Sequence, residues 1–289
     1  MRHAHLRGRG PTYPILDGIV QYPAAPGYVV FTMPCPKRLR VKTNGQVIAD
    51  TTEAVLLFES DHIPIYYFPL SSIRMDLMEP SAFGSHSRYK GSARHYSLRG
   101  AGERGEAILW HYDDPVEGSP DLSGHASFYW HEVDHWYEED EEVFVHARDP
   151  FRRVDCLRSS RRVEVELAGV TVADSTRGVF LFETGLPTRH YLPLEDIRAD
   201  ILEPSPLRTR CPYKGEAKYH NAVIGGQRFE NLIWHYPDPV HEVAPIRGLH
   251  AFGGEFVDAV RVDGIVQERP ETGWGKGYNY TGHRDRSTG

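Results

Sequence analysis

The feature that most constrains this chain is an internal repeat with a constant offset of 124 residues, the separation of Asp50 and Asp174. The two halves align over a long distance without a gap. The clearest matches are Phe58-Glu59 with Phe182-Glu183, Tyr89-Lys90-Gly91 with Tyr213-Lys214-Gly215, and Trp110-His111-Tyr112 with Trp234-His235-Tyr236. A period of this length is a whole domain rather than a solenoid unit, so the sequence predicts two copies of one fold.

The repeat also suggests where the domains begin and end. We expect the first repeat domain over residues 13–138 and the second over residues 139–270. Residues 1–12 and 271–289 are rich in Gly, Arg and polar residues and have no apolar periodicity, which predicts mobile tails. The 289 residues are 40% hydrophobic, enough apolar material for two separate cores.

Within each copy the apolar residues recur with a period of two, which indicates β-strands. Val163, Val165 and Leu167 alternate with charged residues before a turn at Ala168-Gly169, and the first copy has Asn44-Gly45 at the same place. Residues 218–224 and 229–236 flank a second glycine turn. Few windows have helical spacing, and 21 prolines and 27 glycines interrupt the chain. We therefore predict an all-β protein with little helix.

The charge balance argues against several classes of partner. There are 33 Lys and Arg against 40 Asp and Glu, a net charge of −7, whereas nucleic-acid-binding proteins usually carry a basic face. No stretch approaches the roughly 18 to 20 apolar residues of a membrane span. We therefore expect no nucleic-acid and no membrane partner, and a cytoplasmic location by default. Three cysteines, Cys35, Cys156 and Cys211, are too few for a disulfide scaffold.

A segment rich in charge, residues 193–204, contains the first candidate ligand-binding residues. If residues 197–202 are extended, Arg198 and Asp200 share one face and can pair, and the first copy repeats this spacing at Arg74 and Asp76. Such a pair can simply stabilise a strand. A ligand site would add further side chains to the same pocket, for anion recognition and a carboxylate. These additions are Glu203, Tyr213 and Lys214 in the second copy, and Glu79, Tyr89 and Lys90 in the first.

The lysine of the repeated Tyr-Lys-Gly motif is the first candidate catalytic group. Lys214 directly precedes Gly215, and a lysine in a cleft can act as base or nucleophile if burial or a neighbouring cation lowers its pKa. Cys211 lies three residues earlier and has Ser87 as its counterpart, so a role for this thiol would exist only in the second copy. A partly buried, unreactive cysteine is the commoner case.

Aromatic and histidine residues give the remaining candidates. Tyr191 and Trp234 can form the apolar walls of a pocket or close the core, and Asp238 could face the same pocket. Among the 16 histidines, His125, His131 and His135 have no recognised zinc spacing, so we predict no metal. The chain has no phosphate-binding glycine motif and no serine-hydrolase elbow, so we predict no cofactor.

Four runs of the second copy resemble the bacterial family known as domain of unknown function 427, and the first copy resembles it more loosely over residues 36–133. The runs are RVDCLRSSRRVEVELAGVTVADS, LFETGLPTRHYLPLEDIRADILEPS, CPYKGEAKYH and IWHYPDP. The resemblance implies a compact domain of coiled, bent antiparallel β-sheets, similar to β-tent proteins. The family also carries a nucleotidyltransferase-like label, but the paired carboxylates and glycine-rich motif of such enzymes are missing here.

Three functional hypotheses follow from these patterns. The first is the binding of a small acidic or zwitterionic metabolite in a polar pocket of one or both domains. The second is a hydrolase or transferase without a cofactor, in which Lys214 or Cys211 works with Glu203 or Asp238. The third is a scaffold for protein interaction, whose partner the sequence leaves open.

Overall fold

The computed structural model describes residues 20–21, 28–60 and 62–272. These residues fall into two compact units that divide between Ala147 and Arg148, called here the first and the second domain. This boundary is C-terminal to the one predicted at residue 138, because the strand at residues 141–143 pairs within the first domain. The predicted tails lie outside the described residues, except for residues 271–272.

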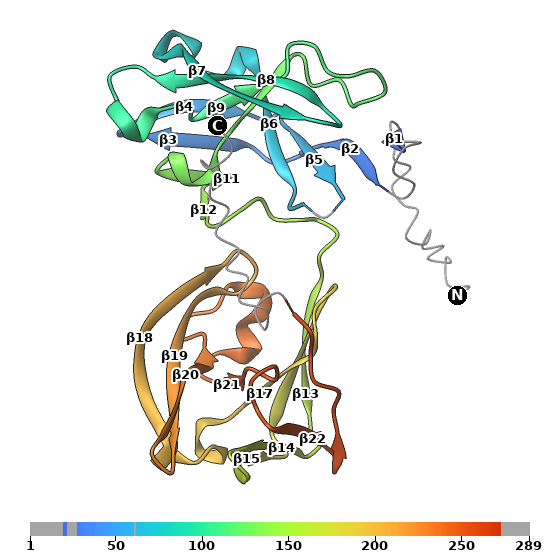
Figure 1. The fold of residues 1–289 in the computed structure, drawn as a ribbon, viewed down its shortest axis with the longest axis vertical. Coiled ribbons are helices and arrows are strands. Elements are labelled where there is room, and N and C mark those ends of the chain that lie inside the picture. The colour runs from blue at the N-terminus through green and yellow to red at the C-terminus, as the bar shows by residue number, and fades with distance from the viewer. Residues whose placement is uncertain (1–19, 22–27, 61, 273–289) are drawn as a thin grey trace, which may run out of the picture. The chain divides into compact units, whose positions relative to one another are not determined.

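The first domain consists of a large and a small antiparallel sheet (Figure 1). The large sheet has the strand order β1-β2-β5-β6-β10-β9-β8-β7, and the small sheet the order β12-β11-β3-β4. The strands are β1 (Val20–Gln21), β2 (Val29–Pro34), β3 (Leu39–Thr43), β4 (Gln46–Thr51), β5 (Val55–Glu59), β6 (Ile65–Pro69), β7 (Met78–Ser87), β8 (Gly91–Leu98), β9 (Leu109–His111), β10 (His125–Phe128), β11 (His135–Glu138) and β12 (Glu141–Val143).

The second domain repeats this topology. Its large sheet has the order β13-β16-β17-β21-β20-β19-β18 and its small sheet the order β15-β14-β22-β23. The strands are β13 (Val154–Ser159), β14 (Val163–Leu167), β15 (Val170–Ser175), β16 (Gly178–Glu183), β17 (Arg189–Leu192), β18 (Leu202–Cys211), β19 (Gly215–Ile224), β20 (Gln227–His235), β21 (His250–Phe252), β22 (Ala259–Val262) and β23 (Ile265–Val266).

The offset of 124 residues holds at the level of individual strand pairs. Phe31 lies opposite Phe58 in the first domain, and Asp155 lies opposite Phe182 in the second. The register shifts also coincide, between Pro80 and Gly84 in β7 and between Pro204 and Arg208 in β18. Such bulges bend a strand, and the long strands β18 and β19 are visibly curved in Figure 1. Positions separated by 124 residues are therefore structurally equivalent.

The local sequence explains the tight turns. Asn44-Gly45 and Ala168-Gly169 have positive φ at both central residues, at 49° and 73° in each turn. This is the type I′ geometry that matches the twist of a two-residue hairpin. All helical elements in the described ranges are short 3-10 turns. They are η1 (Leu70–Ser72), η2 (Met75–Leu77), η3 (Gly102–Gly105), η4 (Trp130–Glu132), η5 (Leu194–Asp196), η6 (Ala199–Ile201) and η7 (His241–Ile246). None is long and apolar enough to cross a membrane.

Two apolar clusters cover the two faces of each large sheet. In the first domain, Leu109 and Phe68 pack toward the small sheet with Val41, whereas Trp110 and Tyr67 belong to a separate cluster on the other face. The second domain is arranged in the same way. The predicted fold, two tandem all-β domains of bent antiparallel sheets with little helix, is confirmed. The extended conformation considered for residues 197–202 is not found, because Ala199–Ile201 forms η6.

Candidate functional site

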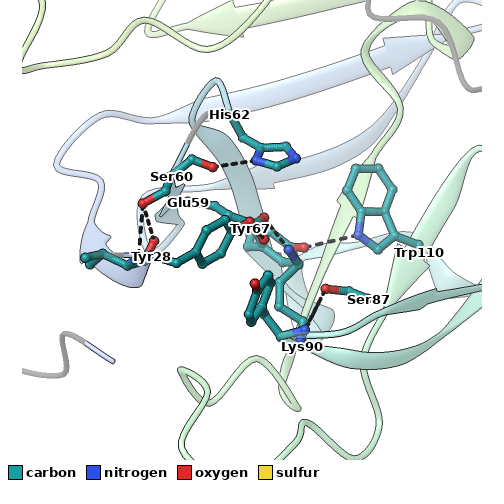
Figure 2. Close-up of polar contacts among 10 residues, drawn as sticks. Tyr28, Glu59, Ser60, His62, Tyr67, Ser87, Lys90 and Trp110 are labelled. Carbon is teal, nitrogen blue, oxygen red and sulfur yellow. Dashed lines mark hydrogen bonds and ion pairs between the residues drawn. The ribbon is translucent and has the colours of Figure 1, made fainter. Parts of the chain in front are cut away.

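The outer face of the first domain's large sheet, the one turned away from the small sheet, carries a buried ion pair between Lys90 and Glu59 (Figure 2). Their side chains are 9% and 7% exposed. The second carboxylate oxygen, Oε1 of Glu59, accepts a hydrogen bond of 2.7 Å from the Tyr28 hydroxyl. Beside this pair, Trp110 Nε1 donates to the Tyr67 hydroxyl at 3.1 Å. Both charges are thus paired among aromatic side chains, as buried charges must be.

The backbone places the lysine between strands. Lys90 lies in the turn that joins β7 to β8, and Glu59 is the last residue of β5. Gly91 has a φ of +97°, and a Cβ there would lie 3.1 Å from the Asp114 carbonyl oxygen. Gly215 has a φ of +100° and the same close approach to Asp238. The glycine that follows the lysine in both copies is therefore explained by its positive φ and by the close approach of the facing backbone.

The second domain keeps this arrangement and changes one charge. Lys214 pairs with Glu183, and Trp234 Nε1 donates to the Tyr191 hydroxyl at 3.0 Å. Arg152 occupies the place of Tyr28, with its Nη1 3.5 Å from Glu183 Oε1. Tyr28 stacks on Tyr89 in the first domain, and Arg152 lies over the Tyr213 ring at 5.8 Å in the second. The second site thus holds two cations and one carboxylate, where the first holds one of each.

The tyrosines of the second site are neutral at ordinary pH. Burial raises the pKa of Tyr191 well above its usual value and that of Tyr213 to about 12. The Tyr213 hydroxyl oxygen accepts a hydrogen bond of 2.8 Å from the Asp149 amide. These side chains can donate hydrogen bonds or form apolar walls, but they are not bases at neutral pH.

The cysteines are unpaired thiols. Cys211 ends β18 as a free, half-buried thiol. Its counterpart Ser87 accepts a hydrogen bond of 3.2 Å from the Lys90 amide. Burial raises the pKa of Cys156, which disfavours its thiolate at neutral pH. Lys214, in turn, already donates to a carboxylate.

Other predicted site residues lie elsewhere and have partners of their own. Arg198 pairs with Asp200, and Arg74 with Asp76. The remaining pairs are Glu203 with Arg228, Asp238 with Arg247, and Glu79 with Arg99, all with exposed side chains. Glu203 lies near one end of the β18–β19 hairpin and Lys214 at the other, where Cys211 faces Gly215. At about 3.3 Å per residue they are roughly 25 Å apart along the strand. The structure therefore does not join Glu203 and Lys214 in one pocket.

A cleft of about 290 Å³ lies in the second domain, where the large and small sheets meet. Its apolar walls include Phe180, Phe182 and Phe252 from the large sheet and Val260 and Val262 from β22. Three arginines reach it, namely Arg161, Arg189 and Arg269, together with Asp258 and Glu268. Apolar walls with a few charged groups are typical of small-molecule sites.

The first domain fills the equivalent space with two tryptophans. Trp130 and Trp136 stack with ring centroids 4.4 Å apart and planes 2° apart. At the equivalent positions the second domain has Gly254 and Val260, both of which line the cleft. The cleft therefore lies where the second domain has lost two large rings.

The charges around this space also differ between the domains. In the first domain, buried Glu138 accepts a hydrogen bond from the Tyr66 hydroxyl and pairs with Lys37. Val262 replaces that carboxylate in the second domain. Arg161 replaces Lys37 and turns to the exposed Asp263 at 2.7 Å.

Two further groups define the polar side of the cleft. Arg189 makes a two-pronged contact with Glu255, at 2.8 and 2.6 Å; Glu255 is buried and the Arg189 side chain is 13% exposed. His190 replaces Tyr66, and its burial, with help from Arg161 and Arg189, lowers its pKa to about 4. A neutral imidazole and a fixed guanidinium thus face the cavity.

Sequence reasoning missed Glu59 and Glu183, although both recur in the repeat. It also missed the cleft, whose signal was the loss of Trp130 and Trp136 from the second copy. The histidines considered for metal binding, His125, His131 and His135, form no three-ligand group in the described ranges.

A model of the family described as "Domain of unknown function (DUF427)" matches the chain twice, over residues 32–139 and 155–263. Both matches lie within the domains described above, one in each. A comparison with curated proteins gave no match.

Proposed function

We propose that the second domain of this chain, which belongs to the DUF427 family and contains two copies of the family's domain, binds a small acidic or zwitterionic metabolite in the cleft between its sheets. The observation that carries this proposal is the cavity of about 290 Å³ at the position where the first domain packs stacked Trp130 and Trp136. The first domain acts as an internal reference, because the same fold closes this space there with two stacked indole rings.

The shape of the cleft favours a ligand with a flat apolar body. Two indole rings occupy the equivalent volume in the first domain. In the second, Phe180, Phe182 and Phe252 remain as walls, so burying an aromatic or branched group there would remove apolar surface from water.

The charges favour an acidic group on that body. Three arginines line the cleft against one aspartate and one glutamate, and the buried carboxylate of the first domain is absent. Arg161 is the best placed to recognise a carboxylate, because its partner Asp263 is solvent-exposed and can be exchanged at little cost. Asp258 and Glu268 could hold the ammonium group of a zwitterion.

The test uses three probes on the full-length protein: indole-3-acetate, tryptophan and indole. We expect indole-3-acetate or tryptophan to raise the melting temperature of the second domain more than indole, which lacks a carboxylate. A ligand at a hundredfold excess over its dissociation constant stabilises the native state by about 2.7 kcal/mol.

The site is located by two variants. Gly254→Trp restores a ring of the first domain, and a Cβ at Gly254 would meet Pro270 at an ordinary 3.5 Å. We expect this variant to lose the response, whereas Lys214→Met retains it. Loss in Lys214→Met with retention in Gly254→Trp would move the site to the Lys214–Glu183 pair. Absence of any response to the three probes would contradict the proposal.

A further inference from the structure

Three histidines come together on the large sheet of the second domain, on three adjacent strands. His220 lies on β19, His235 on β20 and His250 on β21. His235 and His250 are direct cross-strand partners. Lys218 on β19 faces His235, and His220 lies two residues further along β19. All three residues therefore project from the same face of the sheet.

This face is not the one that carries Lys214 and Glu183. The chain neighbours Tyr219, Trp234 and Ala251 pack on the cluster that contains Tyr191, and successive strand residues point to opposite faces. The histidines are thus separated by the thickness of the sheet from the ion pair described above.

The three rings are arranged so that their nitrogens converge. One ring nitrogen from each histidine lies within 4.8 Å of the other two. Ring centroids are 5.5 Å apart for His220 and His235, 5.5 Å for His220 and His250, and 4.5 Å for His235 and His250. Nitrogens bound to one zinc ion lie roughly 3.4 Å apart, given tetrahedral geometry and Zn–N bonds of about 2.0–2.1 Å. Small side-chain rotations would close this difference.

Two of the nitrogens lack partners. Nδ1 of His220 and Nδ1 of His250 are buried and form no hydrogen bond with any described residue. A buried polar atom without a partner costs about 1–3 kcal/mol, and a bound cation would remove that cost. A neutral imidazole offers one nitrogen lone pair to a metal ion.

The donor set indicates which ion would bind. Three neutral imidazoles suit zinc, copper or nickel better than magnesium or calcium, which prefer oxygen ligands. We propose that His220, His235 and His250 form a binding site for a divalent transition metal ion, with Zn²⁺ the best suited. Three protein ligands leave the fourth position of a tetrahedral ion open to water or an anion.

Two basic side chains next to the cluster favour an anion at that fourth position. Arg208, Lys218, His235 and His250 face one another in a row across four strands. Lys218 lies directly opposite His235, and Arg208 lies opposite Lys218 on the next strand. They would repel a bare cation, so a hydroxide or carboxylate on the metal would complete a more favourable site.

The first domain lacks this donor set. The equivalent positions hold Tyr96, His111 and Ala126. His111 Nε2 instead lies 3.4 Å from the Tyr96 hydroxyl and 3.2 Å from an Asp113 oxygen. The proposed site therefore belongs to the second domain alone.

The test is a binding titration of the full-length protein, made without a histidine tag and freed of metal with a chelator. We expect one tightly bound Zn²⁺ per chain by calorimetry, and Co²⁺ used as a probe should give the intense visible absorption of a tetrahedral site. His250→Ala and His220→Tyr insert the residues of the first domain. Each should weaken Zn²⁺ binding by about a hundredfold or more, through loss of a direct ligand.

His111→Ala in the first domain is the matched control and should bind Zn²⁺ like the wild type. Thermal melting of the metal-free variants confirms that they are folded. The proposal is overturned if the wild type binds no Zn²⁺ tightly, or if folded His250→Ala and His220→Tyr bind it with unchanged affinity.

Discussion

The two domains share every strand pair from β2 to β12 with β13 to β23, yet the space between their sheets is filled in one and open in the other. The shared part includes the Lys–Glu pair and the Trp–Tyr hydrogen bond on the outer face of the large sheet. The different part is concentrated between the sheets. This distribution indicates that the outer-face cluster belongs to the shared fold, whereas the inter-sheet space, where we propose the ligand site, is where the two domains differ.

The same comparison holds for charge. Arg152 replaces Tyr28 at the outer-face pair, and Val262 replaces Glu138 between the sheets. Both exchanges make the second domain more positive at these positions than the first. Because the whole chain carries a net charge of −7, these local excesses of positive charge are specific features rather than a consequence of overall composition.

The largest effect is expected from breaking the buried ion pair of the first domain. Lys90→Met leaves the Glu59 carboxylate buried, with the Tyr28 hydroxyl as its remaining side-chain partner among the described residues. Removing one member of a buried pair costs about 3–5 kcal/mol. Lys214→Met should cost about 1–2 kcal/mol less, because Arg152 still lies 3.5 Å from Glu183. Calorimetry of the full chain, with each domain's transition assigned from these two variants, measures the difference.

The control for this prediction is the double variant Lys90→Met with Glu59→Gln, which removes both charges. It should recover part of the stability lost in Lys90→Met. Equal losses in Lys90→Met and Lys214→Met would show that Arg152 does not compensate.

The next effect is expected from converting the packed interior of the first domain into that of the second. Trp136 is 4% exposed, and Trp136→Val inserts the residue found at Val260. Truncating a buried tryptophan to alanine costs about 3–5 kcal/mol, and the valine should recover some of this, leaving about 2–4 kcal/mol. Val260→Ala, at the wall of an existing cleft, should cost less than about 1 kcal/mol. A similar cost at both positions would contradict the difference in packing.

A smaller, pH-dependent effect should distinguish the domains through His190, which replaces Tyr66. Burial lowers the pKa of His190 to about 4 in the folded state, against an ordinary value of 6.5. The unfolded chain therefore binds a proton first as pH falls, so the stability contribution is complete above pH 6.5 and is lost between about 6.5 and 4. At 1.36 kcal/mol per pKa unit, this loss amounts to about 3 kcal/mol at most.

His190→Phe should flatten this pH dependence in the second domain, as measured by calorimetry at pH 7, 5 and 4. Part of the slope should remain, because the pKa of His250 is lowered to about 4 as well, chiefly by burial. An unchanged slope in His190→Phe would show that His190 does not contribute to it.

The limits of prediction from sequence follow from the range of the interactions involved. The repeat and the alternation of apolar residues can be recognised directly in the sequence, and they were sufficient to predict two all-β domains. Glu183 meets Lys214 across strands, 31 residues away in the chain, so no spacing rule connects them. The three clustered histidines are 15 residues apart in sequence and become neighbours only through strand pairing. The spacing of Arg198 and Asp200 indicated that they can pair, and they do, although through a 3-10 turn instead of a strand.

That last pair gives the smallest expected effect, and it tests whether the repeated Arg-x-Asp motif carries a function. Arg198 and Asp200 are 46% and 65% exposed, and Arg74 and Asp76 are 54% and 60% exposed. Surface pairs of this kind gain little because water screens them. Asp76→Asn and Asp200→Asn should therefore leave the melting temperature of both domains unchanged within error, and the response of the second domain to indole-3-acetate unchanged as well. If Asp200→Asn alone abolishes the response, this turn is part of the ligand site, and the two copies differ in function at a motif whose structure they share.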